Sequence, residues 1–137
     1  MGKGGWGFRV EIDGIPEIPI LGVRGLGSEV EVRDQRDAAN PQFIQRSPGA
    51  VRYHNIVLAY AATEGRALFE WHQGVLGGDA DPRNGAVVLL DPEGAEAARW
   101  DFFNGWPVKY EGPELSAAAT EVPIQSLEIV HEGLELT

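Results

Sequence analysis

The side chains that could bind a metal or carry out catalysis in this 137-residue chain are its histidines, carboxylates and serines. The three histidines, His54, His72 and His131, are far apart in the sequence, and none has another histidine two or four residues away. The chain contains no cysteine, which removes disulfides, thiolate zinc ligands and a cysteine nucleophile together. We therefore expect neither a metal site nor a cofactor.

The remaining reactive groups give no specific catalytic signal. Pairs for acid–base catalysis can be drawn among the 21 acidic residues, but so many carboxylates on one small domain approach one another by chance. None of the four serines lies in a nucleophile-elbow sequence. The glycine-rich segment 22–27 (GVRGLG) has neither the GxGxxG order nor the following helix of a phosphate-binding loop. We expect the protein not to be an enzyme.

The formal net charge of -10 is unevenly distributed. Residues 1–68 carry 8 acidic and 8 basic side chains, whereas residues 69–137 carry 13 acidic and 3 basic ones. Wrapping or sequence-specific binding of nucleic acid needs clustered lysine and arginine, so we expect no direct contact of that kind. No apolar run reaches the length of a membrane span and no secretory signal is evident, which predicts a soluble protein made in the cytoplasm.

The elements that must position any site are mostly short strands, which we expect to form one domain over residues 1–137. The strands are expected at residues 6–13, 18–23, 28–33, 56–62, 86–90, 97–103, 108–111, 122–131 and 134–136. Residues 91–94 (DPEG) have the composition of a type I turn between two of them. One helix is predicted, with Thr63 as its N-cap, Trp71 in its apolar stripe and Gly77 and Gly78 at its end.

These elements predict a mainly β fold, a small antiparallel barrel or sandwich of about seven strands with one flanking α-helix. Residues 34–52 are polar, contain Asn40-Pro41 and Pro48-Gly49, and show no periodicity, so we expect a long loop with a functional or interfacial role. The strand 122–131 is partly apolar on both faces. Either an oligomer contact or the helix and a loop of the same subunit could cover its second face.

Two segments resemble the tail tube protein family of contractile-tail bacteriophages and contractile injection systems. They are residues 98–113 (ARWDFFNGWPVKYEGP) and residues 121–134 (EVPIQSLEIVHEGL). Further matches occur in the family's order upstream, including Trp71-His72, so that the likeness extends from about Phe8 to Leu136. The chain departs from the family at residues 59–61 (AYA), where basic residues are common, and at Thr120, where asparagine is usual. These departures concern surface charge and one turn.

The resemblance implies a tube-type barrel with one flanking helix, related to the haemolysin-coregulated proteins of type VI secretion. Such subunits form hexameric rings that stack into a hollow tube inside a contractile sheath, and the tube conducts DNA or protein cargo. The implied partners are other copies of the chain, the sheath protein and the baseplate or tube-initiator proteins, within a phage tail or an injection particle. A tube-initiator ring paralogue at the baseplate and a monomeric ligand-binding β-barrel remain as alternatives.

In such a tube, the predicted loop 34–52 is the segment expected to reach an adjacent subunit or ring. Its candidate contact residues are Arg36, Asn40, Arg46 and Arg52. We expect the arginines to meet the acidic second half of a neighbouring copy. An acidic lumen would repel a polyanionic cargo and keep it from adhering to the wall.

Overall fold

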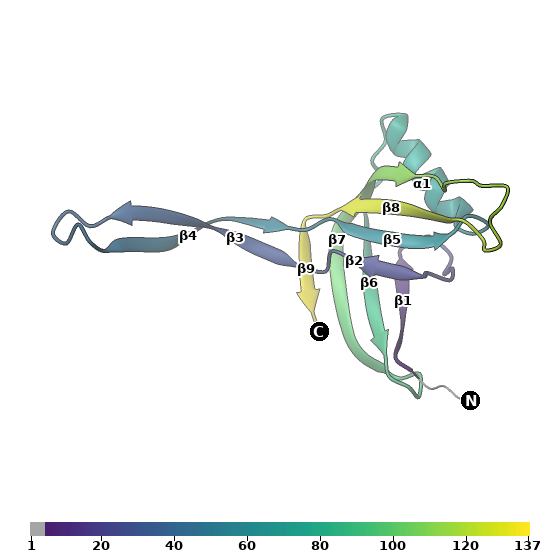
Figure 1. The fold of residues 1–137 in the computed structure, drawn as a ribbon, viewed down its shortest axis with the longest axis horizontal. Coiled ribbons are helices and arrows are strands. Elements are labelled where there is room, and N and C mark those ends of the chain that lie inside the picture. The colour runs from purple at the N-terminus through teal and green to yellow at the C-terminus, as the bar shows by residue number, and fades with distance from the viewer. Residues whose placement is uncertain (1–4) are drawn as a thin grey trace.

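The computed structural model describes residues 5–137, a β-rich body from which one long hairpin projects (Figure 1). Most of the chain is in strands that pair antiparallel, with a single helix between the fifth and sixth strands. The elements are β1 (Gly7–Ile12), β2 (Gly22–Arg24), β3 (Ser28–Arg36), β4 (Ile44–Tyr53), β5 (Ile56–Ala61), α1 (Arg66–Leu76), β6 (Arg83–Leu90), β7 (Glu96–Glu111), β8 (Ile124–Val130) and β9 (Gly133–Leu136). This architecture confirms the predicted fold class.

The body is one seven-stranded sheet in the order β1-β6-β7-β8-β5-β2, with β9 also paired to β7. Strand β7 joins its two halves, because residues 96–105 pair with β6 and β9 whereas residues 106–111 pair with β8. Between these parts Asn104 adopts a φ of 52°. A Cβ at the next residue, Gly105, would lie 2.8 Å from the Phe102 ring, so glycine permits this close packing.

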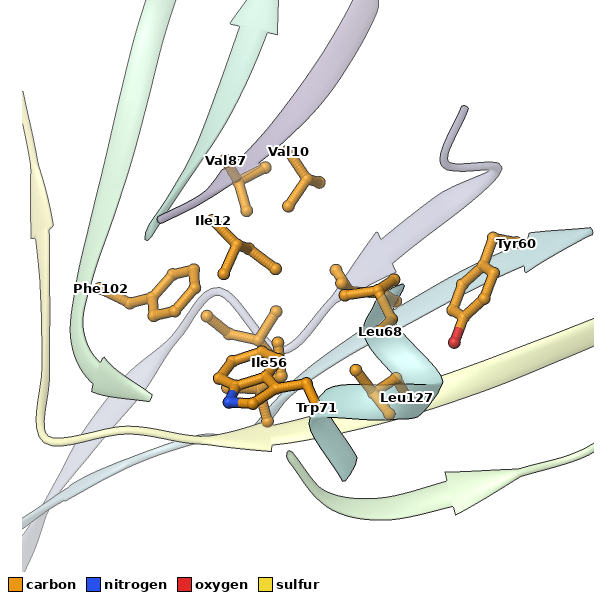
Figure 2. Packing of buried hydrophobic residues seen from close by; sticks show 11 residues of the cluster. Val10, Ile12, Ile56, Tyr60, Leu68, Trp71, Val87, Phe102 and Leu127 are labelled. Carbon is orange, nitrogen blue, oxygen red and sulfur yellow. The ribbon is translucent and has the colours of Figure 1, made fainter. Parts of the chain in front are cut away.

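The two halves of the sheet fold toward each other and enclose the hydrophobic core, which α1 covers on one side (Figure 2). The first half contributes Val10, Ile12, Val87 and Phe102, the second half Ile56, Leu58, Tyr60, Leu127 and Ile129, and α1 contributes Leu68 and Trp71. The strand expected at residues 6–13 is confirmed as β1, in which Val10 and Ile12 are buried while Phe8, on the same side, is 37% exposed. The barrel interior is therefore occupied by side chains.

The helix lies where the sequence predicts it, but it begins later than expected. Thr63 is not its N-cap, because α1 starts after Gly65, whose φ of 80° places it in the left-handed region and which makes no side-chain cap. The Tyr60 ring packs so closely on Gly65 that a Cβ there would overlap it, which fixes this glycine at the turn into the helix. The predicted end at Gly77 is confirmed, and Trp71 is in the core.

The predicted long loop 34–52 is wrong. These residues belong to β3 and β4, which pair with each other as a separate two-stranded sheet, and only residues 37–43 form the connecting turn. We call residues 28–53 the arm, and Figure 1 shows it extending well away from the body. The β3-β4 sheet pairs with no other strand of its own subunit, so neither of its faces has to be apolar throughout. The sequence of residues 34–52 therefore shows no regular alternation of apolar and polar residues.

The strands 97–103 and 108–111, expected to be separate, are parts of the single strand β7. The DPEG turn before β7 is confirmed, with the Gly94 amide donating to the Asp91 carbonyl oxygen at 2.9 Å. Within residues 5–137, no helix combines the length and apolar character needed to cross a membrane.

Candidate functional site

The arm is exposed along its length and forms a sheet separate from that of the body. Every residue of β3 is exposed, and most residues of β4 are exposed as well. An isolated two-stranded hairpin is only marginally stable in water unless something packs on it. The arm is therefore the candidate site, and the chemistry it offers is a contact surface.

The arm has two different faces, because side chains alternate along each strand. Val30 lies opposite Val51, and Val32 lies opposite Pro48, so these four residues share one side, which we call the valine face. Toward the tip this side continues with the opposed pairs Asp34 and Arg46, and Arg36 and Ile44. The side is apolar near the body and mixed near the tip.

The opposite side, which we call the charged face, carries Glu29, Glu31, Arg33 and Arg52. Glu29 lies directly opposite Arg52. Gly49 confirms the assignment, since a Cβ at this position would meet the carboxylate of Glu31 and the guanidinium of Arg33. The pairing shifts by one residue between Val30 and Val32, a bulge that lets the faces stay distinct along the twisted arm.

The four residues predicted from the sequence lie on the arm, but they do not gather into one site. The Arg36 guanidinium donates to the Pro41 carbonyl oxygen at 2.8 Å, and the Asn40 carbonyl accepts the Phe43 amide at 2.9 Å, so both residues shape the tip. Arg46 pairs with Asp34 of its own arm at 3.4 Å. Arg52 lies at the base of the arm on the charged face, away from the other three.

Sequence reasoning missed the apolar residues of the arm as contact residues. Val32, Val51 and Phe43 are each about 60% exposed, and Val30 and Ile44 are nearly half exposed. The alternation of Val30 and Val32 with charged residues was a visible signal of a strand with one apolar side. It could not show that this side faces away from the subunit's own core.

A small polar network fastens the base of the arm to the body. Gly25, with a φ of 95°, turns the chain out of β2, and the His54 amide donates to the Gly27 carbonyl at 3.0 Å. The two ring nitrogens of His131 each lie 2.9 Å from a backbone carbonyl oxygen, one of His54 and one of Gly133. Thus both strands of the arm are anchored where they leave the body.

The His54 ring also reaches into the arm, with Nε2 2.9 Å from the Glu29 carboxylate. This hydrogen bond lowers the pKa of Glu29 below its ordinary value. Two of the three histidines thus act at the arm's base, while His72 is buried beside the Pro107 carbonyl oxygen at 3.0 Å. Among residues 5–137, no group of three or more possible ligands is placed to hold a metal ion.

The outer surface of the first half of the sheet carries a second polar cluster. Arg9 contacts Glu11 at 2.9 Å and Glu96 at 2.6 Å, and Arg99 contacts both carboxylates at 3.2 Å. Hydrogen bonds from Arg9 and then Arg99 lower the pKa of Glu11, and the carboxylates raise the pKa of both arginines. The cluster neutralises charge over Val88, which is fully buried beneath it. This arrangement covers the outer surface of the sheet with paired charges.

A bent antiparallel sheet filled by side chains, one flanking helix and a long uncovered hairpin define a structural subunit built to contact other proteins. Residues 5–135 match the family model of the T4-like virus tail tube protein gp19, and the chain belongs to this family. It is a tail tube protein, as the sequence resemblance implied. No individually curated protein is close enough in sequence to match it.

Solved structures with the same fold come from related assemblies. One is a chain of the PVC sheath-tube complex, an extracellular contractile injection system in the extended state, with a TM-score of 0.84, 20% identity, and 95% of this chain and 87% of that chain covered. Another is a chain of the six-fold symmetrised baseplate of the anti-feeding prophage, with a TM-score of 0.85, 20% identity, and 95% and 91% coverage. Hcp1 from Flavobacterium johnsoniae is similar at a TM-score of 0.61, 16% identity, and 94% and 93% coverage.

Proposed function

We propose that this chain forms hexameric rings that stack into the hollow inner tube of a contractile tail or injection system. The observation that carries the proposal is the arm, which holds exposed apolar side chains on a hairpin outside the body. A subunit that bound its ligand inside the barrel would need an interior space, whereas here the interior is packed. An arm of this kind gains its stability when another copy covers it.

The related structures support six-fold assembly and further partners. They include a sheath-tube complex and a six-fold symmetrised baseplate. We propose corresponding contacts of this chain with a sheath protein and with baseplate or initiator proteins. The mature protein would then be part of a phage tail or an extracellular injection particle.

The tube would conduct DNA or protein cargo. The net charge of -10 supports passage of DNA, because acidic walls repel a polyanion and keep it from adhering. The proposed task is mechanical and requires no catalysis.

Within this assembly, Arg36, Asn40 and Arg46 are proposed to contact a neighbouring copy through the distal half of the arm. All three are exposed, and the acidic second half of the chain supplies opposite charge. For Arg52, on the opposite face, we propose only a long-range attraction to that acidic surface. Replacing the three arginines together with glutamate should raise the concentration needed for assembly, and unchanged assembly would show that these charges do not guide it.

The hexamer is tested by measuring the mass of the purified chain by analytical ultracentrifugation. The wild-type protein should sediment as six copies of the 14.9 kDa chain or as larger stacks. A variant in which residues 31–50 are replaced by an Asn-Gly turn, which would join the opposed pair Val30 and Val51, should stay folded and monomeric, because no core residue lies in the arm. A wild-type protein that remains monomeric, alone or with an initiator protein, would overturn the proposed function.

A further inference from the structure

We infer that the two faces of the arm have separate roles in the assembled protein: the valine face is buried against a second copy of this chain, and the charged face stays in contact with water. The inference rests on the proposed function and adds to it which side of the arm makes the contact. It concerns the proximal half of the arm, where Val30, Val32 and Val51 lie.

Neighbouring residues in the proximal half of the arm differ in polarity, apolar on one face and charged on the other. Val32 and Arg33 are adjacent in β3 and point to opposite sides of a ribbon only one layer thick. The valine side loses unfavourable contact with water when it is covered, whereas covering the other side would remove Glu31, Arg33 and Arg52 from water. Among the described residues, Arg33 and Arg52 form no salt bridge that would lower the cost of their burial.

The charge of the arm favours a second copy as the occupant. Residues 28–53 contain four acidic and four basic side chains, so the arm is neutral, while the rest of the chain carries the whole net charge of -10. Two bodies of this charge repel each other, but a neutral arm can approach an acidic body without that repulsion. A contact through the arm therefore suits self-association of an acidic protein.

The body carries exposed apolar side chains at its other end. The connection between β7 and β8 lies on the side of the molecule opposite the tip of the arm (Figure 1). In and beside this connection, Leu115 is 76% exposed and Val122 and Ile124 are each 46% exposed. Exposed apolar side chains at both ends of the molecule suit a head-to-tail contact, which produces rings or stacks.

The absence of cysteine from the chain allows a direct test with single-cysteine variants. Val32→Cys reports on the valine face and Arg33→Cys, the neighbouring residue, is the matched control on the charged face. Each variant is reacted with a small maleimide, once as dissociated subunits and once as sheath-free assembled tubes. Assembly should slow the reaction of Val32→Cys by about tenfold or more and leave that of Arg33→Cys nearly unchanged.

Several other outcomes would overturn the inference or the proposed function. Equal reactivity of Val32→Cys in subunits and tubes, or protection of Arg33→Cys instead, would overturn the inference while the tube itself stands. Protection of Val32→Cys only after sheath protein is added would also overturn it, because the occupant would then be another protein. If Val32→Cys does not assemble, Val51→Cys on the same face takes its place. A wild-type chain that forms no assembly would remove the proposed function and this inference with it.

Discussion

Replacing Gly25 with alanine should destabilise the subunit strongly, because Gly25 makes the turn from which the arm leaves the body. Its φ of 95° lies in the left-handed region, and a Cβ there would overlap the backbone carbonyl of Asn55. Asn55 cannot easily move away, since its side-chain amide donates to the Glu128 carboxylate at 2.8 Å and the next residue, Ile56, is fully buried.

The expected loss of unfolding free energy has two parts. Placing a non-glycine residue at this φ costs roughly 1–2 kcal/mol. Forcing the backbone to shift around an overlapping atom costs about 1–3 kcal/mol more. The Gly25→Ala variant should therefore lose about 2–5 kcal/mol, a large fraction of the stability of a domain of this size.

Gly94 provides a matched control for the second part. Its φ of 87° is similar, but a Cβ at Gly94 would have no atom within 4 Å. Gly94→Ala should lose only about 1–2 kcal/mol, which is the conformational cost alone. Urea denaturation of the dissociated subunits, followed by fluorescence of the four tryptophans, gives both values. If Gly25→Ala loses no more than Gly94→Ala, the proposed close packing at the base of the arm is incorrect.

Three further substitutions test other parts of the structure by the same unfolding measurement. Phe102→Ala should cost about 3–5 kcal/mol, because the ring is 1% exposed at the bend of the sheet, and a loss below about 1 kcal/mol would contradict its place in the core. Tyr60→Phe should be neutral or stabilising at neutral pH, because the buried hydroxyl has no hydrogen-bond partner. Burial raises the pKa of Tyr60 to about 12, above its ordinary value of 10. The contribution of this group to the free energy of unfolding is therefore present below pH 10 and lost as the pH rises toward 12. Tyr60→Phe should not show this loss. Arg9 and Arg99 lower the pKa of Glu11, so the contribution of Glu11 to the free energy of unfolding is present above pH 4.5, its ordinary pKa, and lost as the pH falls below that value. Glu11→Gln should therefore reduce the dependence of stability on pH in acid. An unchanged dependence would mean that another carboxylate is responsible.

The parts of the fold that the sequence predicts well are those whose side chains pack on the same chain. The strand expected at β1 is correct because Val10 and Ile12 enter the core. The helix and its end at Gly77 are correct because Leu68 and Trp71 form one buried stripe. In these cases the apolar residues recur with the period of the element because one face of the element packs on the core of the same chain.

The strand expected at residues 28–33 is confirmed as the first part of β3, but the rest of the arm was not predicted, because the surface that would cover it belongs to another molecule in the proposed assembly. Its apolar residues alternate with charges, but Pro48-Gly49 and the bulge beside them interrupt the pattern in β4. Strand β7 was divided at residues 104–107 (NGWP), which contain an Asn-Gly pair and a proline, a residue that usually ends a strand ladder. In the structure Pro107 pairs with Ile129 within β7, and the pairing shifts between Pro107 and Lys109.

The contact residues were predicted on the basis of charge, and this was only part of what the arm offers. Arg46 already has a partner in Asp34, and Arg36 contacts the tip of its own arm. The alternation of Val30 and Val32 was visible in the sequence, but that the valines of both strands share one face became recognisable only from the register, which places Val30 opposite Val51. Which side chains of the two strands share a face depends on the register of their pairing. The register of a long hairpin cannot be determined from its composition.

Electron microscopy of the purified chain, with an initiator protein supplied where assembly requires one, shows directly whether the chain forms rings. We expect class averages of rings with six-fold symmetry and an open centre, alone or stacked into tubes. Particles no larger than a single chain under all these conditions, with the arm uncovered, would contradict it.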